Sequence, residues 1–194
     1  LRKVTSAAVT LPAPVVTNSG GGSGTTNTTP VQSTIVIVNG VQQNAGTETI
    51  STDKGQSTVT VTVNNEKIES KINEFVKNNT DGDNNLIQIP IADTKSEVSK
   101  VELTGDIVKK LEKNSFDVSV KRDTVEYVIP AEEFTISKVA ETLGVKETDL
   151  EDIKVEVKIT RADETAVAKY NEVAKANGAA LVISPISFEV VAKT

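Results

Sequence analysis

Hydrophobic and polar positions alternate through most of the chain after residue 31, and this alternation predicts strands. In Thr58–Val63 every second residue is Val and every other one Thr, while Ile153–Ile159 alternates apolar residues with Lys and Glu. Successive side chains of a strand point to opposite faces, so each run has one face for a core. Asn39–Gly40, between two apolar runs, predicts a hairpin. The other predicted strands are Thr34–Val38, Val41–Gln43, Thr47–Ser51, Leu86–Ile91, Val98–Leu103, Phe116–Val120, Thr124–Pro130, Ala180–Ser184 and Ile186–Val191.

In four stretches the apolar residues recur with the period of an α-helix instead of alternating. The first is Glu66–Lys77, where apolar residues recur every three or four positions and Asn65 is the expected N-cap. A single helical turn is also expected where Thr148 and Glu151 have the spacing of a capping box. A second, short helix is capped by Thr104 and carries Ile107, Val108 and Leu111. A third carries Ile136, Val139, Ala140 and Leu143 and ends at Gly144. A fourth begins at Thr160 and Asp163 and ends at Asn177–Gly178, and its inward-facing residues are Val167, Tyr170, Val173 and Ala174.

These elements predict an α+β fold, a β-rich body with about four short helices. The body spans residues 31–194, as one domain or as two packed halves that meet near Thr94.

The first thirty residues differ from the body. Residues 1–16 read as an extended arm, and residues 17–30 as a flexible linker rich in Gly, Ser and Thr. Two interpretations of the arm remain open: it folds back on its own body, or it adds a β-strand to a neighbouring copy. In the second case the expected subunit contacts are Val4, Thr5, Ala7, Val9 and Leu11.

The amino-acid composition argues against several classes of function. The net charge of −6 argues against a nucleic-acid partner or an anionic membrane surface, which would require a basic face. The chain contains no Cys and no His, so it lacks thiolate nucleophiles, disulfides and the usual general base. Carboxylate clusters such as Glu132–Glu133 are present, but a glycosidase normally also lines its cleft with aromatic residues, and these make up 3% of the chain. We therefore expect neither catalysis nor a cofactor.

Two further features concern location. No stretch has the roughly twenty apolar residues of a membrane span, so no membrane insertion is expected. Position 1 is not Met and no signal segment opens the chain, which predicts a processed product or an excised fragment. Together with a Thr-, Asn- and Val-rich, Cys-free composition, this indicates an extracellular or cell-surface protein of a prokaryote.

The polar run before the Leu86 strand has part of the pattern of a calcium loop. Asp81, Asp83 and Asn85 would supply alternate oxygen ligands, but Leu86 replaces the turn glycine and Ala92 replaces the bidentate glutamate. A solvated turn is therefore the preferred interpretation, and no metal is expected. Asn27 and Asn78 each begin a triplet of the N-glycosylation type.

Several segments together resemble a module of Gram-positive surface-layer-associated proteins, in which it accompanies S-layer-homology repeats. The resemblance covers most of Val31–Ala192, without a diagnostic motif or catalytic residues, and the repeats themselves are not in this chain. It implies a structural role at the cell surface. The segments that carry it are Ser33–Gly40, Ile89–Asp93, Val101–Leu111 and Tyr127–Pro130.

Two functions follow as hypotheses. The first is a secreted structural subunit that assembles with copies of itself into a filament or surface layer, by strand complementation through the arm. The second is a non-catalytic binding or spacer module of a cell-wall protein, with cell-wall glycan as its partner.

Overall fold

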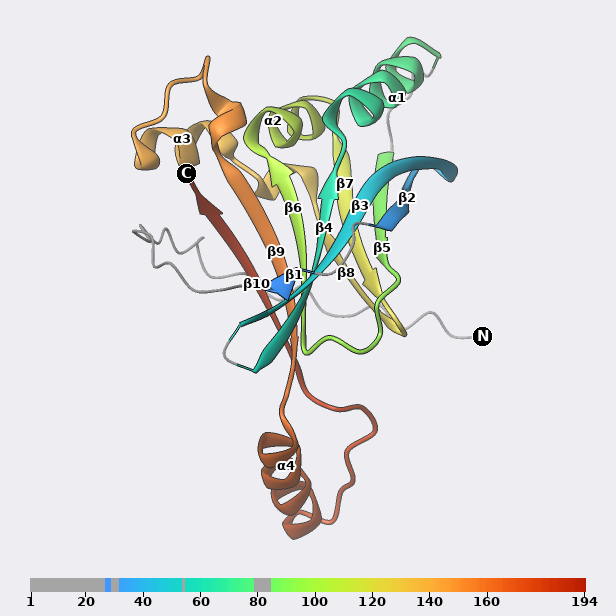
Figure 1. Ribbon diagram of the computed structural model, residues 1–194, viewed down its shortest axis with the longest axis vertical. Helices are drawn as coiled ribbons and strands as arrows, with labels where there is room; N and C mark the ends of the chain where they lie inside the picture. Colours follow the sequence, from blue (N-terminus) through green and yellow to red (C-terminus); the bar gives the residue numbers. More distant parts are fainter. Residues whose placement is uncertain (1–26, 29–31, 54, 79–84) are drawn as a thin grey trace.

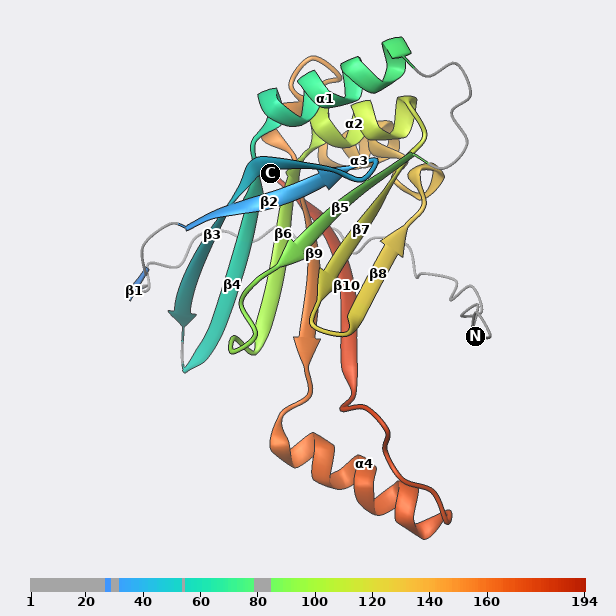
Figure 2. The same cartoon turned by 90° about the vertical axis from the view of Figure 1, so that its right-hand side faces the viewer.

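The computed structural model describes residues 27–28, 32–53, 55–78 and 85–194. In these residues ten strands form a single curled sheet, and three of the four α-helices lie together at one end of it (Figures 1 and 2). The predicted β-rich α+β fold is confirmed. The strands are β1 (Asn27–Thr28), β2 (Gln32–Val38), β3 (Val41–Asp53), β4 (Gln56–Val63), β5 (Asn85–Ile91), β6 (Val98–Thr104), β7 (Phe116–Arg122), β8 (Val125–Ile129), β9 (Lys154–Arg161) and β10 (Ile186–Lys193). The helices are α1 (Asn65–Asn78), α2 (Gly105–Lys113), α3 (Ile136–Leu143) and α4 (Glu164–Ala176), with 3-10 turns at Ala131–Glu133 and Leu150–Asp152.

The strand order is β10-β9-β6-β4-β3-β2-β5-β7-β8, and β1 continues the line of β2 alongside β3. The pairs β4–β6 and β5–β7 are parallel and the remaining pairs are antiparallel. Only Ile37 and Val38 of β2 pair with β5. Along the path from β10 to β8, the junction between β2 and β5 therefore has the fewest paired residues.

The β2–β3 hairpin has the turn that the sequence predicts. Asn39 and Gly40 have φ of 47° and 81°, the left-handed values that a two-residue hairpin turn requires. One expectation was wrong: the two short strands predicted in residues 41–51 are a single strand, β3. Gly46 permits the close approach of β3 to β2, because a Cβ there would collide with the side chain of Thr34 on β2.

Helix α1 has the predicted apolar stripe, with Ile68 and Ile72 fully buried and Val76 exposed. Its cap is shifted by one residue from the prediction, since the Oδ1 atom of Asn64 accepts the Lys67 amide at 3.0 Å. Asn65 instead donates to the Thr104 hydroxyl at 2.6 Å, which links the start of α1 to the start of α2.

Helix α3 ends as predicted at Gly144, which adopts φ of 70°. The capping box predicted at Thr148 and Glu151 is wrong: the Thr148 hydroxyl donates to Asp149, and the single turn begins at Leu150.

The hydrophobic core fills the concave side of the sheet beneath α1, α2 and α3. It consists mainly of Val, Ile and Leu, and Phe116 is its largest fully buried side chain. The Val residues of β4 face this core, as the alternation predicts, and the Thr residues face the other way. The cluster runs in sequence from Val36 to Ala192.

Two predictions for the C-terminal quarter are wrong. Helix α4 is present, and the Asp163 side chain caps it by accepting the Ala166 amide at 2.7 Å. However, α4 buries no residue, so its apolar side does not face inward. The strand predicted at Ala180–Ser184 is absent and Val182 is 95% exposed. Both errors have one cause: this segment projects from the open end of the sheet, away from the other helices, where no described layer covers it (Figure 2).

Candidate functional site

The two edge strands are the first candidate interaction surface. Strands β8 and β10 end the strand order, and each pairs with a single described strand, β7 and β9 respectively. The free side of each edge therefore carries backbone N–H and C=O groups that no described strand pairs, the arrangement that can accept a further strand.

The curl of the sheet brings these two edges toward each other. The rings of Tyr127 on β8 and Phe188 on β10 stack, with centroids 4.6 Å apart and planes at 23°. In the ladders Tyr127 lies opposite Val120 and Phe188 opposite Ile159, both buried, so the rings are on the core face. Burial, followed by the charge of Glu133, raises the pKa of the Tyr127 hydroxyl.

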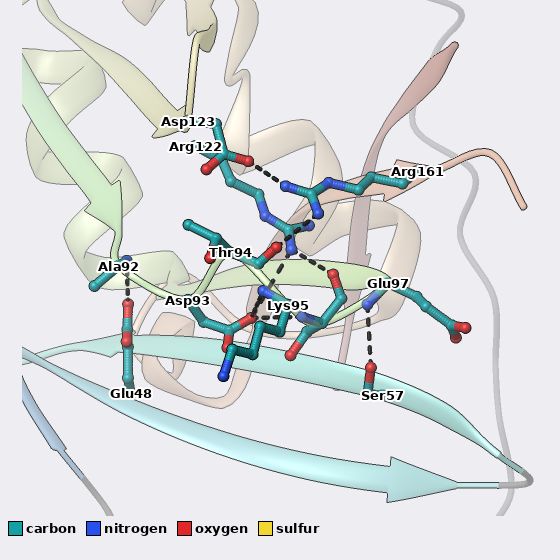
Figure 3. A network of polar contacts seen from close by, with 11 residues as sticks. Glu48, Ser57, Ala92, Asp93, Thr94, Lys95, Glu97, Arg122, Asp123 and Arg161 are labelled. Carbon is teal, nitrogen blue, oxygen red and sulfur yellow. Dashed lines mark hydrogen bonds and ion pairs between the residues drawn. The ribbon is translucent and has the colours of Figure 1, made fainter. Parts of the chain in front are cut away.

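A polar network closes the end of the sheet opposite α1 (Figure 3). The guanidinium of Arg122, which is 2% exposed, donates to the Ser96 carbonyl and lies 3.8 Å from the Asp93 carboxylate. Arg161 donates to the Thr94 carbonyl at 2.7 Å and pairs with Asp123. The loop between β5 and β6 is thereby joined to both β7 and β9.

The charges of the network shift two pKa values. Burial lowers the pKa of Arg122, and the neighbouring Arg161 lowers it further. Burial alone would raise the pKa of Asp93, but hydrogen bonds from Ser96 and Lys95 and the charge of Arg122 outweigh it, so this carboxyl titrates below its usual range. Within the described residues, the Nε and Nη1 atoms of Arg122 have no hydrogen-bond partner, so part of this buried cation is left unsatisfied.

An open cleft of about 1190 Å³ lies between this end of the sheet and the root of α4. Tyr170 of α4 is exposed on its wall, and most of the remaining lining is polar or charged. An aromatic ring beside hydrogen-bonding side chains can contact a hydroxylated polymer by stacking and by hydrogen bonds. The polar side chains of the lining include Gln56, Lys95, Glu97, Arg161 and Glu164.

A charged ladder runs over the outer face of β6, β9 and β10. Glu156 is 3% exposed, and its carboxylate lies 2.7 Å from the Lys193 ammonium, 3.0 Å from that of Lys100 and 3.8 Å from that of Lys158. Burial would raise the pKa of Glu156, but the hydrogen bonds and charges of Lys193 and Lys100 lower it from 4.5 to about 2. The edge strand β10 is thus fixed to β9 by buried charge as well as by its ladder.

The predicted site residues fall partly outside the described residues. Asp81 and Asp83 of the calcium option lie outside the described residues. The side chain of Asn85, the third residue of that option, donates to the Asn114 carbonyl and accepts from the side chain of Asn39. In the described part of the chain no three Asp or Glu residues form a cluster suited to a metal ion. The expected arm contacts Val4, Thr5, Ala7, Val9 and Leu11 all lie outside the described residues.

The two asparagines of the glycosylation triplets are in described segments. Asn27 opens β1, where its backbone lies opposite Thr52 of β3. Asn78 is the last residue of α1 and is exposed.

Two surfaces were not anticipated from the sequence. The edges β8 and β10 were predicted as strands, but strand order is set by pairing between distant segments, which periodicity does not report. The cleft was missed because the apolar stripe of α4, including Tyr170, has the pattern of a core-facing helix.

No protein-family model, curated protein or solved structure matches this chain. Among the described residues no helix is long and apolar enough to cross a membrane.

Proposed function

We propose that this protein is a secreted structural subunit that assembles with copies of itself into an extracellular filament or surface layer. In this proposal the N-terminal arm of one subunit adds a β-strand to the sheet of the next. The observation that carries it is the pair of edge strands whose free sides have no described partner strand. The resemblance to surface-layer-associated modules and the Cys-free composition support a place at the cell surface.

Strand β10 is the better acceptor of the two edges. It has eight residues against five in β8, and the part of the arm that the sequence predicts to be extended, residues 3–11, is of similar length. Pro130 follows directly after β8 and limits any extension of that edge, since proline has no N–H to donate. Backbone hydrogen bonds would supply much of the affinity, at about 1 kcal/mol net for each bond.

The tether is long enough to reach a neighbour. Because Asn27 and Thr28 pair with β3 of their own chain, the segment that would bridge two copies in this proposal is residues 12–26. Fifteen extended residues span at most about 50 Å, and a body of this size is roughly 40 Å across. A contact between the arm of one copy and the edge of the next is heterologous, so it continues into a fibre unless the geometry closes a ring.

Cysteine cross-linking tests this contact directly, because the chain has no Cys of its own. One variant carries Ala7→Cys in the arm, and a second carries Ser187→Cys or Glu189→Cys on the outer side of β10. After mixing and mild oxidation, a disulfide between the two variants reports pairing between different molecules. The matched control is Val128→Cys, an exposed residue on the other edge, β8.

The proposal predicts that Ala7→Cys links to β10 cysteines well above the level seen with Val128→Cys. Equal, low yields at all positions would show that the arm does not pair with β10.

The cleft beside Tyr170 favours a second candidate function, a wall-protein module that contacts glycan. In this alternative the purified chain stays a monodisperse monomer and co-sediments with cell-wall polysaccharide, and Tyr170→Ala reduces the bound fraction. Particles far larger than 20.6 kDa, without binding to the polysaccharide, would instead favour the structural subunit.

A further inference from the structure

The core-facing side of the edge strand β10 is incompletely covered. Ile186, Phe188 and Val190 point to the core face and are half-buried. On the adjacent strand β9, Val157 and Ile159 point to the same face and are fully buried. The two strands differ in that β10 has a described neighbour on one side only. A further strand beside β10 would therefore bury this apolar row, in addition to forming backbone hydrogen bonds.

An aromatic ring from the other edge of the sheet already covers one position of this row. Tyr127 of β8 stacks on Phe188, with ring centroids 4.6 Å apart. Because β9 occupies one side of β10, the ring of Tyr127 reaches Phe188 from the free side. A residue opposite Phe188 on an added strand would have its Cβ about 5 Å from that of Phe188, on the same face as the two rings. The ring pair therefore leaves room there for a small side chain only.

We propose that Ser6 in the arm of a second copy lies opposite Phe188, and that the ring pair of Tyr127 and Phe188 selects a small side chain at this arm position. The inference rests on the proposed function, in which the arm adds a strand to β10. Ser6, Ala7 and Ala8 are three consecutive small residues in the middle of the arm. The arm can pass the ring pair only where one of these small residues faces the core.

The flanking residues distinguish Ser6 from the two alanines. Side chains alternate along a strand, so the residues two positions away on either side also face the core. With Ser6 at the ring pair these residues are Val4 and Ala8, both apolar, and in either direction of the arm they lie beside Ile186 and Val190. With either alanine there instead, one of the two flanking residues would be a threonine. The Ser6 register is the one that places an apolar residue on each side.

In this register Ala7 faces outward. It lies beside Ser187 when the arm runs antiparallel to β10 and beside Glu189 when it runs parallel. These are the two positions that carry Cys in the cross-linking test of the arm contact. The same disulfide therefore reports the effect of a bulky residue in place of Ser6.

A bulky substitution in the arm of the full chain tests the fit. We expect Ser6→Phe, added to the Ala7→Cys variant, to slow formation of the mixed disulfide with the β10 cysteine roughly tenfold, because the larger side chain overpacks the space beside the rings. The matched control is Thr5→Phe in the same variant. Its side chain faces outward, away from the rings, so it should leave the rate unchanged.

A complementary change in the acceptor identifies the ring that makes the selection. Tyr127→Ala, added to the β10 cysteine variant, removes the phenol ring and should restore the disulfide with the Ser6→Phe arm to near the original rate. Tyr127→Leu, which keeps more of the apolar surface, is the second acceptor variant, and urea unfolding checks that both are folded. A general loss of stability would slow the disulfide with every arm, whereas the expected recovery is confined to the Ser6→Phe arm.

The outcomes separate this inference from the proposed function. Equal rates for the Ser6→Phe and Thr5→Phe arms, or no recovery with either Tyr127 variant, would overturn the selection of Ser6 and leave strand addition to β10 intact. No mixed disulfide from any arm, the Ala7→Cys arm without a second substitution included, would overturn the proposed function and this inference with it.

Discussion

Replacing Glu156 by Gln isolates the contribution of one buried charge to stability. Its carboxylate is held between Lys193 at 2.7 Å and Lys100 at 3.0 Å, and it is 3% exposed, so solvent screens these contacts only weakly. Gln keeps the size and shape of the side chain but carries no charge. The substitution therefore removes the ion pairs without opening a cavity.

The pKa of Glu156 gives the magnitude and its pH dependence. A fall from 4.5 to about 2 on folding corresponds to about 3 kcal/mol of stability at neutral pH, since one pKa unit equals about 1.4 kcal/mol. Because the folded state has the lower pKa, this stabilisation is complete above about pH 5.5 and is lost as the pH falls from about 5 to 2. Burial would lower the pKa of Lys100, but the hydrogen bonds and charges of Glu102 and Glu156 outweigh it and raise this pKa. The part due to Glu156 is the same ion pair seen from the other side, so it is not added separately.

Urea unfolding at pH 7 and pH 2.5 measures the effect. At pH 7 the Glu156→Gln variant should be destabilised by up to about 3 kcal/mol, and at pH 2.5 the difference should shrink below about 1 kcal/mol. Glu189→Gln is the control: Glu189 is 57% exposed and lies 3.5 Å from Lys158, so this change should have almost no effect. Equal destabilisation of Glu156→Gln at both pH values would refute the assignment of the low pKa to this carboxylate.

Three further predictions concern the fold and the metal state. Gly105→Ala should destabilise the protein by roughly 1–3 kcal/mol in urea unfolding, because a Cβ would lie 2.6 Å from the Leu150 carbonyl oxygen; an unchanged midpoint would contradict this. A double-mutant cycle with Tyr127→Leu and Phe188→Leu should give a coupling free energy of about 1 kcal/mol for the stacked rings, and additive single effects would show that the two rings do not interact. Chelation should leave the melting temperature unchanged, because the calcium pattern before Asn85 is incomplete; a fall of more than about ten degrees would reveal a bound ion.

The sequence predicts the elements that local chemistry determines. The strict alternation of Thr58–Val63 indicates β4 because one face of that strand must be apolar, and Asn39–Gly40 fixes a turn that few other residue pairs can adopt. Gly144 ends α3 for the same reason.

What the sequence could not predict depends on distant contacts. The apolar stripe around Tyr170 is that of a core-facing helix, yet α4 buries no residue because no described layer covers it. Likewise, Glu156 has the alternation of a solvent-facing residue in β9, yet it is buried because Lys100 and Lys193 come from the strands on either side of it. Strand order decides both outcomes.

Strand addition by the arm is tested most directly by comparing the full chain with a chain lacking residues 1–16, by sedimentation velocity and electron microscopy. We predict that the full chain forms particles far larger than its 20.6 kDa mass, and that the truncated chain is folded, does not form these assemblies and binds a synthetic peptide of residues 1–16. The peptide should occupy the β10 edge without rebuilding the assembly, because it carries no second body. Assembly of the truncated chain to the same size as the full chain would contradict the account.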